Sequence, residues 1–318
     1  MTRKYIIGSR GSELALWQAN FVKTRLESLF PECTFEIKTI KTTGDQLLDT
    51  ALSKIGDKGL FTRQIETELL NGDIDLAVHS LKDLQTVQPD GLVIGAVCER
   101  GAANDAFISK SYTSIDSLPK DARVATGSLR RKSQLLNFRP DLKIVEIRGN
   151  VPTRLKKFEE SDLDGMILAY AGLHRLGFEE KVSQLIPFDL MLPAVGQGAV
   201  AVEVRDGDEQ VLEMTARLDD EPTRICITAE RAFLRRLEGG CQVPIGALAT
   251  LENGRIRLDG MVASLDGSVV FSEHVDGVAG DAETLGTRLA ATLIDRGADN
   301  LLSESREHAN VSPEAIMP

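Results

Sequence analysis

One cysteine in the sequence has surroundings suited to chemistry. The stretch LEGGCQVPIG, from Leu237 to Gly246, places Cys241 directly after two glycines and shortly before a proline. Glycine lets the backbone form a tight, exposed turn and lets a large partner approach closely. Cys33, Cys98 and Cys226 instead lie among Val, Ile, Phe or Thr, which is typical of buried structural thiols. Cys241 is therefore the candidate for a reactive thiol.

Six arginines form a second group of candidates. They fall in predicted turns or just after predicted strands, at the edge where open α/β sheets bind ligands. A single arginine is more often a solvated surface residue. Because arginine binds carboxylates through two parallel hydrogen bonds and keeps its charge, the group predicts a ligand with several carboxylates or phosphates. The six residues are Arg10, Arg130, Arg131, Arg148, Arg154 and Arg175.

The charge distribution argues against a nucleic acid as the partner. The chain of 318 residues has a formal net charge of −11, whereas nucleic-acid binding needs a dominant positive face. Aromatic residues, on which single-stranded bases stack, make up 5% of the chain. Positive charge is nevertheless concentrated, since residues 123–156 contain nine Lys or Arg and two Asp or Glu, a net charge of +7 against −18 for the remainder.

One carboxylate follows a predicted strand beside this cationic region. In DLAVHSLKD, Lys82 and Asp83 come just after the strand. Near several arginines a carboxylate is ordinarily a salt-bridge partner. It can also stay ionised to stabilise a developing cation or to accept a proton, and the residues alone leave both roles open. Alternation of side chains along the strand predicts that His79 is buried.

Alternating strand and helix signals indicate an α/β protein up to about residue 205. Residues 42–59, with three glycines and no clean period, predict a loop, and the helix that follows is predicted to end near Gly72. The segments IIGSRGSELALWQ and RVATGSLRRKSQLL share one plan, a strand, a turn of small residues, an arginine and an amphipathic helix. Ser12 is predicted to cap the first of these helices. Its predicted apolar face is Leu14, Leu16, Trp17, Phe21, Val22, Leu26 and Leu29.

The C-terminal part of the chain has a different order of elements. A helix from about Pro222 to Leu237 is followed by the cysteine turn, three strands and a helix near Leu285 to Arg296, which predicts a small α+β domain. Four cysteines and four histidines at irregular spacing give neither a disulfide framework nor a metal site. The N-terminal residues lack the apolar stretch of a signal peptide or membrane anchor. We therefore expect a cytoplasmic protein without a metal.

Eight strings of the sequence resemble the porphobilinogen deaminase (hydroxymethylbilane synthase) family. They are RGSELALWQA, GDKGLF, AVHSLKD, TGSLRRKSQL, RGNVPTRL, ILAYAGLHRLG, LPAVGQGAV and AERAFLRRLEGGCQVPIG, and they cover most of the chain. The resemblance implies two type-II periplasmic-binding-protein-like α/β domains and a C-terminal α+β domain that carries the cysteine. The expected boundaries are residues 1–98 with 199–217 for domain 1, residues 99–198 for domain 2, and residues 218–318 for domain 3.

The resemblance also implies an activity and a cofactor. Cys241 would carry a dipyrromethane, two linked pyrroles attached as a thioether, which serves as the primer. Enzymes of the family deaminate four porphobilinogen molecules and add them stepwise to this primer, releasing hydroxymethylbilane and four ammonia molecules for tetrapyrrole biosynthesis. A thiol is the side chain most able to trap the azafulvene left by loss of ammonia. Because each pyrrole bears an acetate and a propionate, the primer alone brings four carboxylates to the cationic segment.

Site residues are carried over by the same resemblance. Asp83 would lie under the pyrrole nitrogens, stabilise the cation and help with proton transfer. Lys54 and Lys58, in the predicted loop, would close over the cleft as a lid. The cofactor would be held by Ser80, Lys82, Asp83, Thr126, Ser128, Arg130, Arg131, Arg148, Arg154 and Cys241. The substrate would be held by Arg10, Ser12, Gln18, Arg148, Arg154, Arg175 and Gln197.

Two departures and one alternative accompany this resemblance. The family often has proline at the positions of Glu13 and Gln85; Glu13 suits the first turn of a helix equally well, whereas Gln85 puts the stiffness of the Asp83 loop in doubt. The alternative to an enzyme of this family is a solute-binding or effector-sensing module, since one fold serves many functions. Such a module would explain the arginines but not Cys241. We expect porphobilinogen as the partner of a monomeric chain, with no nucleic acid and no membrane.

Overall fold

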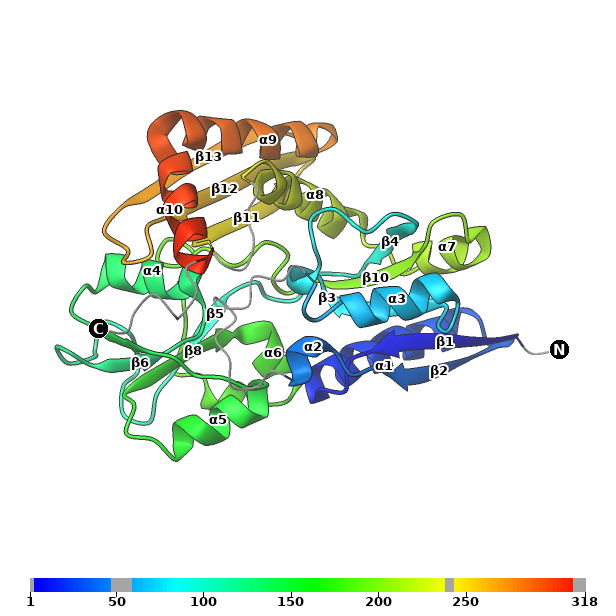
Figure 1. The fold of residues 1–318 in the computed structure, drawn as a ribbon, viewed down its shortest axis with the longest axis horizontal. Coiled ribbons are helices and arrows are strands. Elements are labelled where there is room, and N and C mark those ends of the chain that lie inside the picture. The colour runs from blue at the N-terminus through cyan, green and yellow to red at the C-terminus, as the bar shows by residue number, and fades with distance from the viewer. Residues whose placement is uncertain (1–2, 47–58, 238–242, 311–318) are drawn as a thin grey trace. The chain divides into compact units, whose positions relative to one another are not determined.

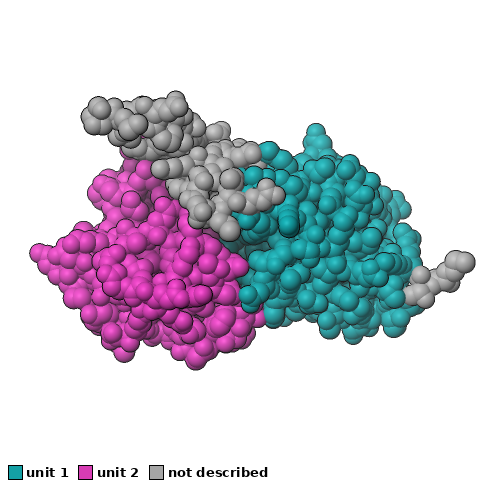
Figure 2. Space-filling view, turned by 60° about the horizontal axis from the view of Figure 1, so that its bottom comes forward, with its two compact units in different colours: residues 1–48, 58–102, 196–224 teal, residues 49–57, 103–195, 225–318 magenta. Residues whose placement is uncertain are grey.

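The computed structural model of the chain describes residues 3–46, 59–237 and 243–310. The chain divides into two compact units, coloured separately in Figure 2. Unit 1 contains residues 1–48, 58–102 and 196–224, and unit 2 contains residues 49–57, 103–195 and 225–318. The three expected domains and their boundaries stay a prediction.

Unit 1 is built on a five-stranded sheet with the order β2-β1-β3-β10-β4 (Figure 1). Strand β1 pairs in parallel with β2 and β3, whereas β10 runs antiparallel to both β3 and β4. The strands are β1 (Arg3–Ser9), β2 (Cys33–Thr39), β3 (Leu76–Ser80), β4 (Leu92–Val97) and β10 (Val200–Arg205). The helices are α1 (Glu13–Leu29), α2 (Thr43–Gln46), α3 (Arg63–Asn71) and α7 (Glu209–Ala216).

The first sheet of unit 2 repeats this plan, with the order β7-β6-β8-β5-β9. Strand β6 pairs in parallel with β7 and β8, and β5 runs antiparallel to β8 and β9, so the antiparallel strand again takes the fourth place. The strands are β5 (Asp105–Ile108), β6 (Arg123–Ala125), β7 (Lys143–Val145), β8 (Gly165–Ala169) and β9 (Gln184–Leu185). The helices are α4 (Leu129–Phe138), α5 (Val151–Glu159) and α6 (Tyr170–Arg175).

The last part of the chain forms an antiparallel sheet of β11 (Ile245–Glu252), β12 (Arg255–Ala263) and β13 (Val270–Val278). Helix α8 (Glu221–Arg236) precedes the sheet, and α9 (Ala282–Leu293) and α10 (Asp299–Asn310) follow it. Phe233 of α8 packs with Leu258 of the sheet and Leu289 of α9 in one apolar core. The predicted fold class, two similar α/β sheets of the type-II periplasmic-binding-protein kind followed by an α+β part, is confirmed.

Helix α1 begins where the sequence predicted, and its buried face matches the predicted one only in part. Ser12 is its N-cap, and the Ser12 side chain accepts a hydrogen bond from the Ala15 N–H at 3.4 Å. Of the predicted apolar face, Val22 and Leu26 are buried, whereas Trp17 and Leu29 are 37% and 41% exposed, so the prediction is only partly confirmed. Ala15 and Ala19 are buried as well, because small side chains let the helix lie close to the sheet. The buried residues are Ala15, Gln18, Ala19, Val22 and Leu26.

The segment between β2 and β3 contains more helix than the sequence indicated. The predicted loop opens with α2, and only its end, from residue 59, is again within the described ranges. Helix α3 ends as predicted, with Gly72 in the left-handed conformation at φ +78°. Across the described residues, no helix is long and apolar enough to cross a membrane.

Candidate functional site

The predicted site residues of unit 1 gather at one edge of its sheet. The parallel strands β1 and β3 both end at this edge, and the antiparallel strand β10 begins there. Arg10 and Ser12 follow β1, Ser80 ends β3, and Gln197 precedes β10. This is the carboxyl edge, at which open α/β sheets bind ligands.

Asp83 ends a short 3-10 turn that directly follows β3. The turn is held from inside, because Leu81 and Leu84 are only 1% and 6% exposed. Gln85, the departure noted above, has a carbonyl that accepts a hydrogen bond from Gln88 Nε2 at 3.1 Å. Asp83 itself is exposed, and its carboxylate makes no hydrogen bond or ion pair with any residue the structure describes. The carboxylate is therefore open to a ligand.

Polar side chains close to Asp83 in the sequence form hydrogen bonds with the segment before β10 and with α1. Lys82 Nζ donates to Gln197 Oε1 at 3.4 Å, which links the turn to the segment before β10. Gln18, on α1, is 2% exposed, and its Nε2 donates to Ser80 Oγ at 2.9 Å. Four of the predicted residues thus form two pairs at this edge.

Arg10 is paired with a carboxylate that the sequence analysis missed. Its Nε donates to Asp45 Oδ1 at 3.1 Å, and its guanidinium carbon lies 4.2 Å from the centre of the Phe61 ring. Burial opposes ionisation of Asp45, but Arg10 and Thr42 outweigh it and lower the pKa of that carboxyl. A ligand carboxylate would have to share Arg10 with Asp45 or displace it.

His79 is buried as predicted, and it belongs to a cluster of titratable groups from β3, β10 and α3. Its Nε2 lies 3.2 Å from Oε2 of Glu203, which is fully buried. Glu66, on α3, is 4% exposed. Burial raises the pKa of Glu66, repulsion by Glu203 adds to this, and Thr62, His79 and Arg63 only partly offset it.

Glu66→Gln is expected to change how stability depends on pH. Because the pKa of Glu66 is higher in the folded than in the unfolded chain, the stability it contributes is present below the unfolded pKa and is lost as pH rises through the folded pKa. Glutamine does not ionise, so the variant lacks this loss of stability. The urea midpoint of the variant minus that of the wild type should therefore increase as pH rises across this window. A difference that stays constant with pH would contradict the shift.

The predicted site residues of unit 2 gather at the carboxyl edge of its first sheet. The parallel strands β6, β7 and β8 lead into α4, α5 and α6, respectively. Arg130 and Arg131 lie in the first turn of α4, Arg154 lies in α5, and Arg175 ends α6. Three neighbouring strand ends thus supply the cationic residues.

Thr126 and Ser128 shape the start of α4. Ser128 is the N-cap, and its Oγ accepts from the Arg131 N–H at 3.5 Å. Thr126 Oγ1 accepts from the Ser128 N–H at 3.2 Å. The turn therefore fixes where the first residues of α4 point, as the sequence plan of strand, small-residue turn, arginine and helix predicted.

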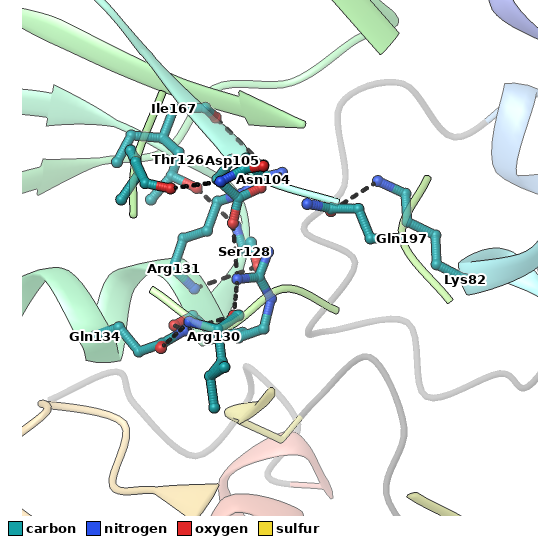
Figure 3. Close-up of polar contacts among 12 residues, drawn as sticks. Lys82, Asn104, Asp105, Thr126, Ser128, Arg130, Arg131, Gln134, Ile167 and Gln197 are labelled. Carbon is teal, nitrogen blue, oxygen red and sulfur yellow. Dashed lines mark hydrogen bonds and ion pairs between the residues drawn. The ribbon is translucent and has the colours of Figure 1, made fainter. Parts of the chain in front are cut away.

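Arg130 and Arg131 converge on Asp105, the first residue of β5 (Figure 3). Arg131 Nη2 lies 2.7 Å from Asp105 Oδ1, and Arg130 Nη1 lies 2.8 Å from Asp105 Oδ2. Burial opposes ionisation of Asp105, but the two guanidinium groups hold the pKa of its carboxyl far below the usual range. All three side chains are buried, and together they carry one net positive charge.

The two arginines differ in the donors that they leave open. Arg131 Nε and Nη2 donate to Asp105, and Nη1 donates to the Ile167 carbonyl at 3.2 Å, so each of its nitrogens is used. Arg130 Nη1 donates to the Leu192 carbonyl at 2.6 Å in addition to its contact with Asp105. Within the described ranges, Arg130 Nε and Nη2 make no hydrogen bond, and Arg130 is therefore the arginine with donors left for a ligand.

Arg148 and Arg154 flank the turn between β7 and α5. Arg148 Nε and Nη2 donate to Glu146 Oε1 at 2.9 and 2.7 Å, a partner that the sequence analysis also missed. Arg154 Nε donates to the carbonyl of Gly149, whose φ of +120° favours glycine. Asn150 caps α5 by accepting from the Thr153 N–H at 2.9 Å.

The described thiols are poor candidates for covalent chemistry. Cys98 and Cys226 are buried at 0% and 7% exposure, as the sequence indicated. Cys33 is only partly covered, and burial together with Glu32 raises the pKa of its thiol, which lowers the fraction of reactive thiolate. Cys241 and the lid candidates Lys54 and Lys58 lie outside the described residues.

Comparisons with known proteins identify the family of the chain. Residues 5–213 match the family model "Porphobilinogen deaminase, dipyromethane cofactor binding domain", and residues 224–295 match "Porphobilinogen deaminase, C-terminal domain". A porphobilinogen deaminase of Pelotomaculum thermopropionicum is 53% identical over 307 residues, 96% of this chain and 98% of that protein. One from Carboxydothermus hydrogenoformans is 52% identical over 310 residues, 98% of this chain and 100% of that protein.

Among solved structures, the chain is similar to the methionine-binding protein MetQ, with a TM-score of 0.45 and 14% identity over 68% of this chain and 89% of that one. The two family models together span nearly the whole sequence, and the cofactor-binding one covers both edges described above. The chain belongs to the porphobilinogen deaminase family, and residues 5–213 form its dipyrromethane-cofactor-binding domain.

Proposed function

We propose that Asp83 is the catalytic residue with which this chain carries out the reaction of its family. That reaction deaminates four porphobilinogen molecules, with loss of four ammonia molecules, and joins them stepwise on a dipyrromethane. One water molecule then cleaves the new chain from the dipyrromethane and releases it as hydroxymethylbilane. The observation that supports Asp83 is its exposed carboxylate, held on a buried turn and without a partner among the residues that the structure describes.

The reaction uses such a carboxylate twice. When the C–N bond of the aminomethyl group breaks, its electron pair leaves with ammonia and the pyrrole becomes a cation, which a nearby negative charge stabilises. When the new carbon–carbon bond has formed, a proton leaves the pyrrole carbon, and the Asp83 carboxylate accepts it before passing it to solvent. When bound, the dipyrromethane supplies the nucleophilic pyrrole carbon for the first addition.

The residues of unit 2 suit a group that bears four carboxylates. Arg130, Arg131 and Asp105 carry a net positive charge at the start of α4, where the helix dipole also favours anions. We assign Arg130 as the main cofactor ligand of this trio, because its Nε and Nη2 donate to no acceptor in the part of the chain that the structure describes. Cys241 is assigned as the covalent anchor, since the three described thiols are buried or have a raised pKa.

Arg148→Leu is expected to arrest elongation at an intermediate length. The variant removes one pair of guanidinium donors while the other arginines still hold their carboxylates. Turnover should fall by about 10- to 100-fold, the effect of losing one charge-assisted contact. Intact-mass spectra during turnover should show one covalent species accumulating. Arg123→Leu is the control, because Arg123 opens β6 at the opposite edge and pairs with the exposed Asp162; equal spectra for both variants would contradict the assignment.

The compartment and the oligomeric state are also proposed. The four cysteines lie at irregular spacing that gives no disulfide framework, which supports a reducing compartment such as the cytoplasm. We propose that the chain acts there as a monomer, with Lys54 and Lys58 as lid residues. Sedimentation at micromolar concentration should give a single species of 34.6 kDa plus the adduct, and a dimer would contradict the proposal.

A further inference from the structure

Gln134 is a buried polar side chain on α4 that the proposed chemistry does not use. It is 7% exposed and follows Arg130 by one helical turn. Its side-chain amide makes two hydrogen bonds with the backbone of Leu192, and its Nε2 also donates to the Arg130 carbonyl at 3.2 Å. Gln134 Oε1 accepts from the Leu192 N–H at 2.8 Å, and Gln134 Nε2 donates to the Leu192 carbonyl at 3.1 Å. Both the amide and the carbonyl of Leu192 are thus held by one side chain.

The carbonyl that Gln134 holds is also an acceptor for Arg130. Arg130 Nη1 donates to Leu192 O at 2.6 Å and lies 2.8 Å from Asp105 Oδ2; Figure 3 shows Gln134, Arg130 and Asp105 in this network. Two acceptors therefore fix the guanidinium plane, a carboxylate on β5 and a main-chain carbonyl in the loop before Pro193. The position of the second acceptor depends on Gln134.

The same loop is held from its other side by β11. The Ala247 N–H donates to the Pro193 carbonyl at 3.0 Å. Gly246 has no side chain where Leu192 passes, and a Cβ there would come within 2.9 Å of the Leu192 carbonyl. Leu192 and Pro193 thus lie between α4 and the first residues of β11. This short backbone segment therefore contacts Arg130 on one side and β11 on the other, so we expect a change in how Gln134 holds it to reach both.

We propose that Gln134 is a positioning residue for Arg130: by holding the Leu192 backbone it aims the unused Nε and Nη2 of Arg130 at a carboxylate of the dipyrromethane. The inference rests on the proposed role of Arg130 as a cofactor ligand. A buried amide suits this task, because it satisfies a backbone donor and acceptor at once without adding charge beside Asp105 and Arg131.

Gln134→Leu in the full chain tests the proposal. The variant keeps the volume but loses both hydrogen bonds to Leu192 and the one to the Arg130 carbonyl, so we expect attachment of the dipyrromethane to slow about tenfold, the factor for one misaligned charge-assisted contact. The measurement is the fraction of protein that carries the adduct, followed by intact mass at intervals after expression begins. Gln134→Glu keeps the acceptor for the Leu192 N–H but has no donor for the carbonyl, and it should also load slowly; this variant answers the question if the leucine variant does not fold.

The control is Asn137→Leu on the same helix. Asn137 Nδ2 donates to the Gly267 carbonyl at 3.0 Å, so this variant also weakens the contact of α4 with the C-terminal sheet but leaves Leu192 and Arg130 untouched. It should load like the wild type even if its melting temperature falls. Wild-type loading of Gln134→Leu, or equally slow loading of Asn137→Leu, would overturn the proposal. Wild-type loading of Arg130→Leu would instead overturn the proposed role of Arg130.

Discussion

Asp83→Asn should lower the turnover of porphobilinogen by about 10³-fold, in the range expected when a main electrostatic element of an active site is lost. The amide keeps the size of the side chain and its hydrogen-bonding ability. It removes both the charge that stabilises the pyrrole cation and the base that accepts the proton. Because Asp83 is exposed and has no partner in the described residues, the melting temperature should not change. The measurement is steady-state ammonia release together with a thermal scan.

Asp90→Asn is the matched control for this experiment. Asp90 is another exposed aspartate of unit 1, in the segment between the Asp83 turn and β4. Its replacement changes the net charge of the unit by the same amount and should leave turnover unchanged. Near-normal activity of Asp83→Asn, or an equal loss in both variants, would remove Asp83 from the catalytic role.

Cys241→Ala is expected to abolish both the covalent adduct and the activity. No described cysteine can replace it, because Cys98 and Cys226 are buried and the pKa of Cys33 is raised. Cys241→Ser should load slowly and incompletely, since a hydroxyl is a much poorer nucleophile than a thiolate at neutral pH. Intact mass and product formation are measured in parallel, with Cys33→Ala as the control that should keep the adduct. An active Cys241→Ala variant would contradict the assignment of Cys241 as the covalent attachment site.

The elements that position the site could be predicted from local patterns. The strand before Asp83 and helix α4 with Arg130 have their predicted places, because a short apolar run and a small-residue turn with a cap determine local structure without distant contacts. Strand β5 was not predicted, since its four residues show no alternation and it forms only by pairing with β8 and β9. With β5 the sequence analysis also missed Asp105.

The partners of the arginines could not be predicted either. Asp105 precedes Arg130 by 25 residues and Asp45 follows Arg10 by 35, so no local spacing brings them together. The sequence shows a cationic segment, and from sequence alone its charge was attributed to binding of a ligand. The structure shows that part of this charge is neutralised within the protein. Each nitrogen of Arg131 donates to Asp105 or to the Ile167 carbonyl, whereas Arg130 keeps two nitrogens as open donors. Such a division of roles depends on side-chain geometry that identical residue types do not reveal.

The covalent primer is the most direct test of the whole account. We predict that the intact protein, as isolated, is heavier than its sequence by two linked pyrrole units, and that proteolytic peptides place this mass on Cys241 and on none of Cys33, Cys98 and Cys226. Addition of porphobilinogen should then increase the mass in steps of one pyrrole, and the two-pyrrole adduct should remain after product is released. An active protein whose mass equals that of its sequence would contradict the account.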